Sequence, residues 1–474
     1  MATNRRDFLK GTAWMGVTAA LSGRFLNAAD KLSAPGYMSG YAAPALKTVR
    51  VGHVGLGMRG PGAVHRMAAI PGVKVAALCD LYPNRVAAQQ KWLTDNGHEA
   101  AAEFSGPEGY KALCESDIDL VYITSPWHLH VPIALYAMEH GKHVAIEVPA
   151  AMNMEECWAC VETSERTGKH CMQLENCCYG AVEMFCLNMA RQGAFGEIMH
   201  GEGAYIHDLR DLNYLDPAQG GYQGYWRLKW NADHHGNPYP THGLVPIMQA
   251  MNINRGDQFD YLTCVSTRQH GMDEYAKIKF GENSWQAQLH PKCGDMSTTV
   301  IKTILGRTIM IQHDVTSARP YSRINTISGT KGIVSDYPFR VALAKTPGGG
   351  AHEWMNSQAL DEVYAKYEHP LWHDAGLLAQ KMGGHGGMDF LMDLRLIYCL
   401  QNGLPLDMDV YDLAASCSLC ELTERSALNR GQSQDIPDFT RGGWKTAKPL
   451  GIETVDLAKL GLSDVTEDKD ALNV

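Results

Sequence analysis

The chain has 474 residues, a formal net charge of −10 and an isoelectric point near 6.0. That length exceeds what a single hydrophobic core usually supports, so we expect two domains. Apolar residues make up 45% of the sequence and charged residues 20%, which is ordinary for a globular protein, and the acidic balance argues against nucleic-acid binding, which needs basic patches.

The first 29 residues have the order of an export signal. They contain the twin-arginine pair Arg5-Arg6, then a weakly apolar stretch, then small residues suited to cleavage. The apolar stretch falls short of the roughly 20 residues that a membrane span requires, which disfavours an anchor. The segment therefore predicts export through the twin-arginine pathway to the periplasm or the exterior. Residues 30–47, rich in Ala, Pro, Gly and Ser, are expected to form a tether.

The segment 51–60 has the pattern of a dinucleotide-binding turn. A short apolar strand leads into Gly55-x-Gly57-x-x-Gly60, and a helix and a second strand follow before Asp80. The first glycine allows the tight bend, the second lets the backbone approach a pyrophosphate, and the third lets the helix pack on the strand. The free N–H groups at the helix start favour phosphate. Asp80 can accept hydrogen bonds from a ribose 2′-hydroxyl and would repel a 2′-phosphate, so the sequence predicts NAD rather than NADP.

Strands and helices alternate through the first part of the chain. The predicted strands are 51–54, 73–78, 120–124, 143–146 and 169–174, and the predicted helices are 61–70, 132–140 and 155–167. Such alternation indicates a parallel, doubly wound sheet whose ligands lie at the carboxyl ends of its strands. The loops at 125–130 and 147–150 follow two strands and should face the cofactor. We expect a Rossmann domain over residues 48–178.

Beyond residue 180 the pattern changes to that of an α+β domain. Polar and apolar residues alternate with β-branched enrichment, which favours an open, mostly antiparallel sheet with one face covered. The predicted helices are 182–192 and 388–401, and the predicted strands are 198–205, 261–267, 284–289, 298–303 and 308–313. We expect an α/β protein in which this second, substrate-binding domain covers residues 179–450 and a tail covers 451–474.

The thirteen cysteines do not have the spacing of a disulfide scaffold, and their number is odd. Cys157-x-x-Cys160 and Cys417-x-x-Cys420 lie in helix-like segments without the glycine-containing turn of a zinc knuckle. Buried structural thiols are the better interpretation. The sequence predicts no metal site.

The order of a glycine fingerprint, a Ser-Pro-x-x-x-His loop at 125–130, a Glu-x-Pro loop at 147–149 and a second sheet domain resembles the Gfo/Idh/MocA oxidoreductases. In the dehydrogenases of that family, a lysine in the Glu-Lys-Pro loop acts with a downstream Asp-x-x-x-His pair on the substrate hydroxyl. This chain keeps His242 but has Val148 in place of the lysine and Pro238 in place of the aspartate. The resemblance therefore implies changed chemistry or loss of activity.

Six further motifs narrow the resemblance. They are Glu147-Val-Pro-Ala-Ala151, Asn176-Cys-Cys-Tyr179, Tyr225-Trp-Arg227, Tyr239-Pro-Thr-His-Gly243, Arg319-Pro-Tyr321 and His385-Gly-Gly-Met-Asp389. Over about residues 48 to 445 the chain resembles glycoside hydrolase family 109, which contains NAD-dependent α-N-acetylgalactosaminidases that are often exported. The resemblance implies hydrolysis of terminal α-N-acetylgalactosaminides.

The mechanism that this resemblance implies is redox-neutral and belongs to the NAD-dependent exceptions among glycosidases. Hydride leaves C3 of the sugar for NAD, a base removes the C2 proton, and the aglycone leaves by elimination. Water then adds at C1, the C2 proton returns, and the hydride returns to C3. Because NAD ends as it began, an exported enzyme needs no external cofactor pool.

The resemblance also implies the site residues. Groups that hold and release protons at neutral pH are needed for such a cycle, and the catalytic candidates are His242, Tyr321 and Tyr179. The expected substrate-binding residues are Tyr205, Arg227, Tyr239, Pro240, Thr241, His242 and Tyr321. The expected cofactor-binding residues are Gly55, Gly57, Met58, Arg59, Gly60, Asp80, Trp127, His128, Leu129, His130, Glu147, Val148 and Asn176.

Two other functions stay open at this point. A periplasmic NAD-dependent sugar oxidoreductase would produce net NADH, and a non-catalytic sugar-binding module would bind sugar without turning over any aryl glycoside. The expected partner is a small glycoside or a glycan, with no nucleic acid and, after removal of the signal, no membrane. Assembly into a homo-oligomer is left open.

Overall fold

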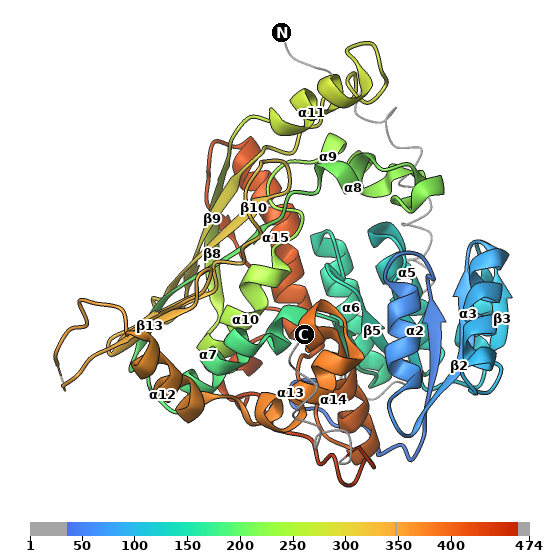
Figure 1. Ribbon diagram of the computed structural model, residues 1–474, viewed down its shortest axis with the longest axis horizontal. Helices are drawn as coiled ribbons and strands as arrows, with labels where there is room; N and C mark the ends of the chain where they lie inside the picture. The colour runs from blue at the N-terminus through green and yellow to red at the C-terminus, as the bar shows by residue number, and fades with distance from the viewer. Residues whose placement is uncertain (1–35, 347, 463–474) are drawn as a thin grey trace.

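The computed structural model describes residues 36–346 and 348–462, and two β-sheets organise them (Figure 1). The predicted export signal, part of the tether and the end of the tail lie outside the described residues. None of the described helices combines the length and the apolar composition that crossing a bilayer would require.

The first sheet, sheet A, is parallel throughout and confirms the predicted doubly wound domain. Its strand order is β3-β2-β1-β4-β5-β6, with β1 Val49–Val54, β2 Val73–Asp80, β3 Ala102–Ser105, β4 Leu120–Ile123, β5 His143–Ile146 and β6 Cys171–Gln173. The connecting helices are α2 Gly60–Ala68, α3 Pro83–Asp95, α4 Gly109–Glu115, α5 Trp127–Glu139 and α6 Met154–Thr167. Strands β4 and β5 are buried along their whole length, as expected where helices cover both faces of a sheet.

The second sheet, sheet B, has the order β13-β12-β11-β7-β10-β9-β8-β14, and all its pairs are antiparallel except β7 with β10. Its strands are β7 Ile198–Ile206, β8 Phe259–Ser266, β9 Ser297–Thr303, β10 Thr308–Asp314, β11 Thr326–Gly329, β12 Gly332–Ser335, β13 Arg340–Leu343 and β14 Gln434–Asp435. This confirms an open, mostly antiparallel sheet.

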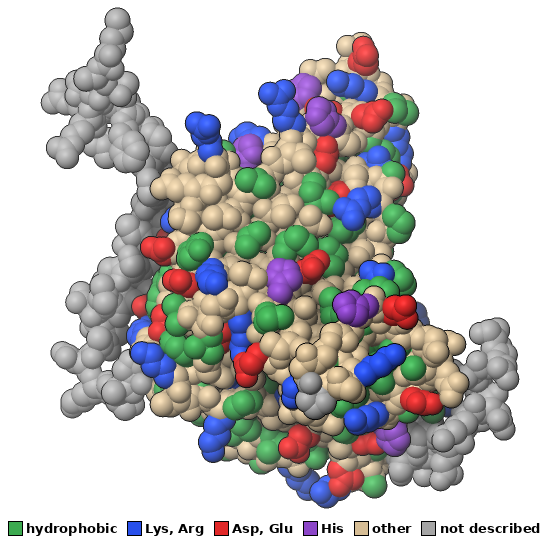
Figure 2. Space-filling model, turned by 90° about the vertical axis from the view of Figure 1, so that its left-hand side faces the viewer, with side chains coloured by type: hydrophobic (Ala, Val, Ile, Leu, Met, Phe, Trp, Pro, Cys, Tyr) green, Lys and Arg blue, Asp and Glu red, His purple; other side chains and the backbone are tan. Residues whose placement is uncertain are grey.

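Helices cover one face of sheet B and leave the other uncovered among the described residues. The helices of this part are α7 Ala181–Arg191, α8 Arg210–Tyr214, α9 Trp226–Asp233, α10 Thr241–Met251, α11 Gly271–Phe280, α12 Ser357–Tyr367, α13 Pro370–Met382, α14 Met388–Asn402 and α15 Val410–Leu428. Figure 2 faces the uncovered side, where hydrophobic side chains are scattered among polar ones. Tyr261, Val265 and Val300 point outward there, with 39%, 60% and 45% of their surface exposed.

The two sheets share a hydrophobic core. Helix α10 packs on β7, and α15 packs on β8 of sheet B and also on α6 and β6 of sheet A, while α14 reaches α2 and β1. One continuous cluster of buried side chains therefore joins residues from both sheets. Sheet A ends at residue 173 and sheet B begins at residue 198, with the short helix η2 Asn176–Tyr179 between them.

Two predicted elements differ from the structure. Residues 284–289 form turns and no strand, because the Ser284 hydroxyl accepts a hydrogen bond from the Ala287 amide and stabilises a local bend. Helix α5 begins at Trp127 rather than at Pro132. All thirteen cysteines are buried and unpaired, as the interpretation of structural thiols predicted.

Candidate functional site at the junction of the two sheets

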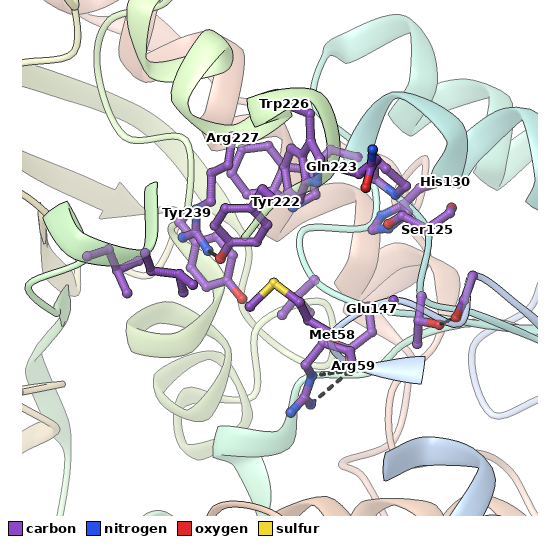
Figure 3. Close-up of a pocket in the computed structure, with 18 of the residues that line it drawn as sticks. Met58, Arg59, Ser125, His130, Glu147, Tyr222, Gln223, Trp226, Arg227 and Tyr239 are labelled. Carbon is purple, nitrogen blue, oxygen red and sulfur yellow. Dashed lines mark hydrogen bonds and ion pairs between the residues drawn. The ribbon is translucent and has the colours of Figure 1, made fainter. Parts of the chain in front are cut away.

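A cavity of about 300 Å³ lies where the carboxyl ends of the strands of sheet A meet the start of the second domain (Figure 3). The order of sheet A reverses between β1 and β4, and ligands of open parallel sheets bind at such a point. In Figure 3, Tyr222, Trp226 and Arg227 lie on one side of the cavity, and Met58 and Arg59 lie on the other.

The predicted residues that line this cavity come from both sides. From the cofactor set these are Gly55, Gly57, Met58, Arg59, Asp80, Trp127, His130, Glu147, Val148 and Asn176, and from the substrate set they are Tyr205, Arg227, Tyr239 and His242. Sequence reasoning assigned no role to several others, among them Arg85, Thr124, His207, Leu209, Leu212, Tyr222 and Gln223.

The glycine turn has room for a pyrophosphate. Gly55 has a φ of +95°, and a Cβ atom there would lie 2.7 Å from the Ser125 amide nitrogen. A Cβ on Gly60 would lie 2.2 Å from the Gly55 carbonyl oxygen, so close packing requires a glycine at this position also. At Gly57 the nearest atom, Nη1 of Arg85, is 3.4 Å away. The turn thus fits the backbone approach that a dinucleotide needs.

Asp80 is held at the end of β2 by backbone amides. Its Oδ2 accepts a hydrogen bond from the Leu56 amide at 2.7 Å, and its Oδ1 accepts one from the Tyr82 amide at 2.9 Å. Arg85 Nη1 lies 3.7 Å from Oδ1. Because a carboxylate offers about four lone pairs, the fixed carboxylate can still accept hydrogen bonds from a ribose.

An ion-pair network holds in place several side chains at the cofactor-binding side of the cavity. Arg59 donates to Glu147 Oε1 at 2.9 Å and to Asp389 Oδ2 at 3.0 Å, and the Asn176 amide donates to Asp389 Oδ1 at 2.6 Å. His385 Nδ1 is 3.0 Å from the same carboxylate. Burial alone would raise the pKa of Asp389, but the hydrogen bond from His385 and the nearby positive charges hold it well below its usual range. Sequence reasoning gave Asp389 no separate role, although it ends one of the quoted motifs.

Arg227 stands in a box of aromatic rings. The guanidinium carbon lies 4.8 Å from the centre of the Tyr239 ring, 5.2 Å from that of Trp127 and 5.9 Å from that of Tyr205. Its Nη1 donates to the Tyr222 hydroxyl at 2.9 Å, while Nη2 is buried without a partner. A buried N–H group without a partner is costly, so this arrangement favours a ligand that brings an oxygen acceptor.

His242 is paired with a carboxylate that the sequence analysis missed. His242 lies in the first turn of α10, and its Nδ1 is 2.6 Å from Glu175 Oε1. The Cys177 amide donates to the same oxygen at 3.1 Å. Burial alone would raise the pKa of Glu175, but the charge and hydrogen bond of His242 help to hold it below its ordinary value. Because the carboxylate occupies Nδ1, the other ring nitrogen is left to exchange a proton with a ligand.

One feature of the sequence could have identified Glu175 as a site residue. It follows directly after the predicted strand 169–174, beside Asn176, at the carboxyl end where ligand-facing residues gather. Its pairing with His242 could not be seen, because 67 residues separate the two side chains.

The structure corrects the catalytic role expected for Tyr179. This side chain is fully buried outside the cavity wall, and its hydroxyl donates to Asp407 Oδ2 at 3.0 Å. Burial and the Asp407 charge hold its pKa well above the usual range. Tyr179 therefore packs behind the site and does not reach a ligand.

The remaining expected residues surround the cavity without lining it. Tyr321 packs edge-on against His207, with ring centres 5.0 Å apart, and its hydroxyl accepts a hydrogen bond from Arg323 at 3.0 Å, which places it at the rim. Thr241 is buried beside His242, and Pro240 precedes α10. His128 and Leu129 are exposed on the first turn of α5, and Gly60 contributes by packing.

Comparisons with known proteins agree with this two-part architecture. The family described as "Oxidoreductase family, NAD-binding Rossmann fold" matches residues 49–174, and "Glycosyl hydrolase 109, C-terminal domain" matches residues 179–446. An alpha-N-acetylgalactosaminidase of Bacteroides fragilis is 48% identical over 410 residues, which cover 86% of this chain and 96% of that protein. A glycosyl hydrolase family 109 protein of Shewanella amazonensis is 47% identical over 456 residues, or 95% of this chain and 99% of that protein.

Solved structures share the fold at low sequence identity. A levoglucosan dehydrogenase in complex with NADH and levoglucosan has a TM-score of 0.58 at 18% identity, and covers 82% of this chain and all of its own. An NAD binding oxidoreductase from Klebsiella pneumoniae has a TM-score of 0.60 at 16% identity, and covers 83% of this chain and all of its own.

Proposed function

The chain belongs to glycosyl hydrolase family 109, and we propose that it hydrolyses terminal α-N-acetylgalactosaminides by a redox-neutral cycle that uses bound NAD. Its N-terminal part is an NAD-binding Rossmann domain, and it is a glycoside hydrolase by family. The choice of sugar and the course of the reaction are the proposal.

One observation carries the proposed mechanism: the cavity holds no free pair of carboxylates. Of the described residues that line it, the carboxylates are Asp80 and Glu147. Asp80 is bound by two backbone amides and Glu147 by Arg59. Ordinary glycosidases need one carboxyl group as acid and another as base or nucleophile, flanking the scissile bond. The site offers a histidine with a buried carboxylate partner instead.

Bound NAD supplies reversible acceptance of hydride at C3 of the sugar, which makes the neighbouring C2 proton acidic. His242 is placed to take and return a proton at the sugar ring, and Glu175 fixes its ring orientation and stabilises its charged form. Arg227 has an unpartnered N–H for an acceptor such as the acetamide carbonyl. Aromatic rings surround the Arg227 guanidinium, and polar contacts are stronger in such apolar surroundings than in water.

The loss of the dehydrogenase lysine agrees with this assignment. Val148 lines the cavity as a buried apolar side chain at the position where the sequence comparison expects the lysine. A valine cannot exchange a proton with a hydroxyl, so the proton transfers fall to His242 and to the tyrosines nearby. Tyr239 and Tyr205 contact the His242 ring, with centres 4.9 and 5.2 Å apart, and Tyr321 stays a candidate at the rim.

A set of 4-nitrophenyl glycosides tests the proposed function. We expect the purified protein to release nitrophenol from the α-N-acetylgalactosaminide while absorbance from NADH does not accumulate. Steady accumulation of NADH with the free sugar would favour a sugar oxidoreductase. Binding of the sugar with no release from any glycoside would favour a binding module.

We also propose that the protein is exported through the twin-arginine pathway, because Arg5-Arg6 precedes a weakly apolar stretch and small residues. An enzyme that regenerates its NAD in each turnover can operate where no cofactor pool exists. Replacing both arginines with lysine should keep the protein in the cytoplasm on cell fractionation. Assembly into a homo-oligomer stays a prediction that the size of the purified protein in solution would check.

A further inference from the structure

His242 and two side chains behind its ring form a group of three potential metal ligands. Glu175, Cys177 and His242 each present a ligand atom, and these atoms all lie within 4.8 Å of one another. Glu175 is the N-cap of η2, Cys177 lies within η2, and His242 lies in the first turn of α10. No spacing in the sequence reveals this group, because its members are separated by 65 residues or more across the two segments.

The polar atoms of the group are incompletely satisfied. Glu175 Oε1 is 2.6 Å from His242 Nδ1, and the Thr241 hydroxyl lies near enough to the carboxylate to help lower its pKa, but the second oxygen, Oε2, is buried without a well-aligned hydrogen bond. The side chain of Glu175 is wholly buried, and Cys177 is only 1% exposed. The Cys177 thiol makes a weak contact of 3.6 Å with Asn176 Oδ1. A buried carboxylate whose second oxygen lacks a well-aligned donor, beside a thiol and an imidazole, offers a donor set for a cation.

The donor set selects the kind of cation. Carboxylate, thiolate and imidazole are together the ligands of Zn²⁺, and the thiolate disfavours Mg²⁺ and Ca²⁺, which take oxygen donors. Tetrahedral coordination brings ligand atoms somewhat closer than the widest separation here, so small side-chain shifts would complete the geometry. Three protein ligands leave a fourth position for water.

We propose that Glu175, Cys177 and His242 form a latent inhibitory site for a thiophilic divalent cation such as Zn²⁺. On binding, the metal forms bonds to Sγ, to Nδ1 and to a Glu175 oxygen, and the thiol proton and any proton on Nδ1 leave to solvent. No oxidation or reduction takes place. The ion then separates His242 from its carboxylate partner.

The position of the site predicts how inhibition would look. His242 lines the cavity, whereas the other two ligands lie behind it. The metal would thus occupy the space behind the imidazole and leave the sugar-binding side open. We expect zinc to lower kcat with little change in KM, and to act more slowly when a sugar fills the cavity.

The binding part of this inference stands apart from the proposed function, and only the inhibition rests on it. The NAD-loaded protein is freed of metal with a chelator and titrated with Zn²⁺ alone. We expect one ion per chain, and loss of nitrophenol release in step with binding. Co²⁺ in place of Zn²⁺ should give the charge-transfer absorption of a cobalt–thiolate bond.

Two neighbouring cysteines give a matched comparison. Cys178 is equally buried but lies outside the group, so Cys178→Ser should bind zinc as the unaltered protein does. Cys177→Ser should weaken zinc binding by at least about tenfold, the loss typical even of an outer-sphere partner, and should lose the cobalt–thiolate band. Cys177→Ala serves as a second variant if the serine form does not fold.

Equal inhibition of Cys177→Ser and of the unaltered protein by zinc would overturn the proposal, as would a cobalt–thiolate band that persists in both Cys177 variants. Absence of stoichiometric zinc binding would overturn it as well. If the protein cleaves no glycoside, the proposed function fails, while zinc stoichiometry and the cobalt band still decide the metal site.

Discussion

At the scale of single residues, the proposed proton transfer depends on the pair formed by His242 and Glu175. A histidine alone titrates near neutral pH, but its ring can turn and either nitrogen can carry the proton. The fully buried carboxylate, 2.6 Å from Nδ1, removes both freedoms. In the proposed mechanism Glu175 is therefore a positioning residue, whose effect reaches the substrate through His242.

Glu175→Gln should lower kcat by about 10²-fold or more, because general acid–base catalysis contributes about 10² to 10⁴ and the glutamine cannot stabilise the charged imidazole. KM should change little, since Glu175 does not line the cavity. Glu165→Gln is the matched control, because Glu165 is also buried but bonds Tyr411 and Arg441 away from the cavity. An unchanged kcat in Glu175→Gln would remove the pair from the mechanism.

Because the pKa of Glu175 is lowered in the folded protein, the free energy of unfolding depends on its ionisation. A carboxyl group whose folded pKa lies below its unfolded value contributes stability that is fully present above the unfolded value. That contribution is lost as the pH falls through the folded pKa. Glu175→Gln should therefore unfold more easily than the unaltered protein at neutral pH, and urea titrations at acidic pH should show the difference shrinking. A difference that does not depend on pH would contradict this.

Residues within one local pattern could be predicted from the sequence, and residues paired across the fold could not. The glycine turn and Asp80 follow from a strand–turn–helix pattern that occupies 30 consecutive residues from 51 to 80. Glu175 and Asp389 were missed because their partners lie 67 and 330 residues away. Tyr179 was misjudged because a motif shows that a residue is present but not which way its side chain points.

At the scale of elements, the start of α14 completes the cofactor side from the far end of the chain. Gly384 and Gly387 have φ values of +82° and +105°, and a Cβ on Gly384 would lie 2.6 Å from Cβ of Asp389. This tight turn sets Asp389 in the first turn of the helix, where the helix dipole favours a negative charge. The carboxylate then meets Arg59 of the glycine turn.

Asp389→Asn should release NAD during purification and destabilise the fold. The change removes the countercharge of the partly exposed Arg59 and of the buried Arg66, and breaking a buried pair such as that with Arg66 costs about 3 kcal/mol or more. The nucleotide content of the denatured protein and the thermal midpoint measure the two effects. In Asp407→Asn, the control, a buried pair with Arg395 away from the cavity is broken. That variant should lose stability and keep its NAD, and equal nucleotide loss in both variants would contradict the role of Asp389.

Most strands of sheet A and most of the helices that connect them could be predicted. Apolar runs typical of strands alternate there with segments of helical periodicity, and the sequence of each segment largely determines its secondary structure. The segment 284–289 has the same alternation as a strand, but a serine side chain satisfies the backbone locally and no neighbouring strand pairs with it. Strands β11, β12 and β13 were missed because each is four residues long and is stabilised by its neighbours in the sheet.

At the scale of the whole molecule, the cavity exists because the two sheets share one core and one junction. The domain of sheet A supplies the glycine turn, Asp80 and Trp127 of the aromatic box, and the second domain supplies Arg227, the tyrosines of that box and His242. A sugar held by Arg227 is thus set against the cofactor side of the same cavity. This arrangement is the one that the proposed reaction requires, in which a glycoside hydrolase uses bound NAD and consumes none.

The central claim is that the C2 proton leaves and returns in each turnover, and hydrolysis in D₂O tests it most directly. The protein is given 4-nitrophenyl α-N-acetylgalactosaminide in D₂O, and the released sugar is examined by nuclear magnetic resonance for deuterium at C2. Free N-acetylgalactosamine kept in D₂O without enzyme is the control. We predict deuterium at C2 with no net NADH, whereas release of the sugar with its C2 hydrogen intact would contradict the redox-elimination cycle.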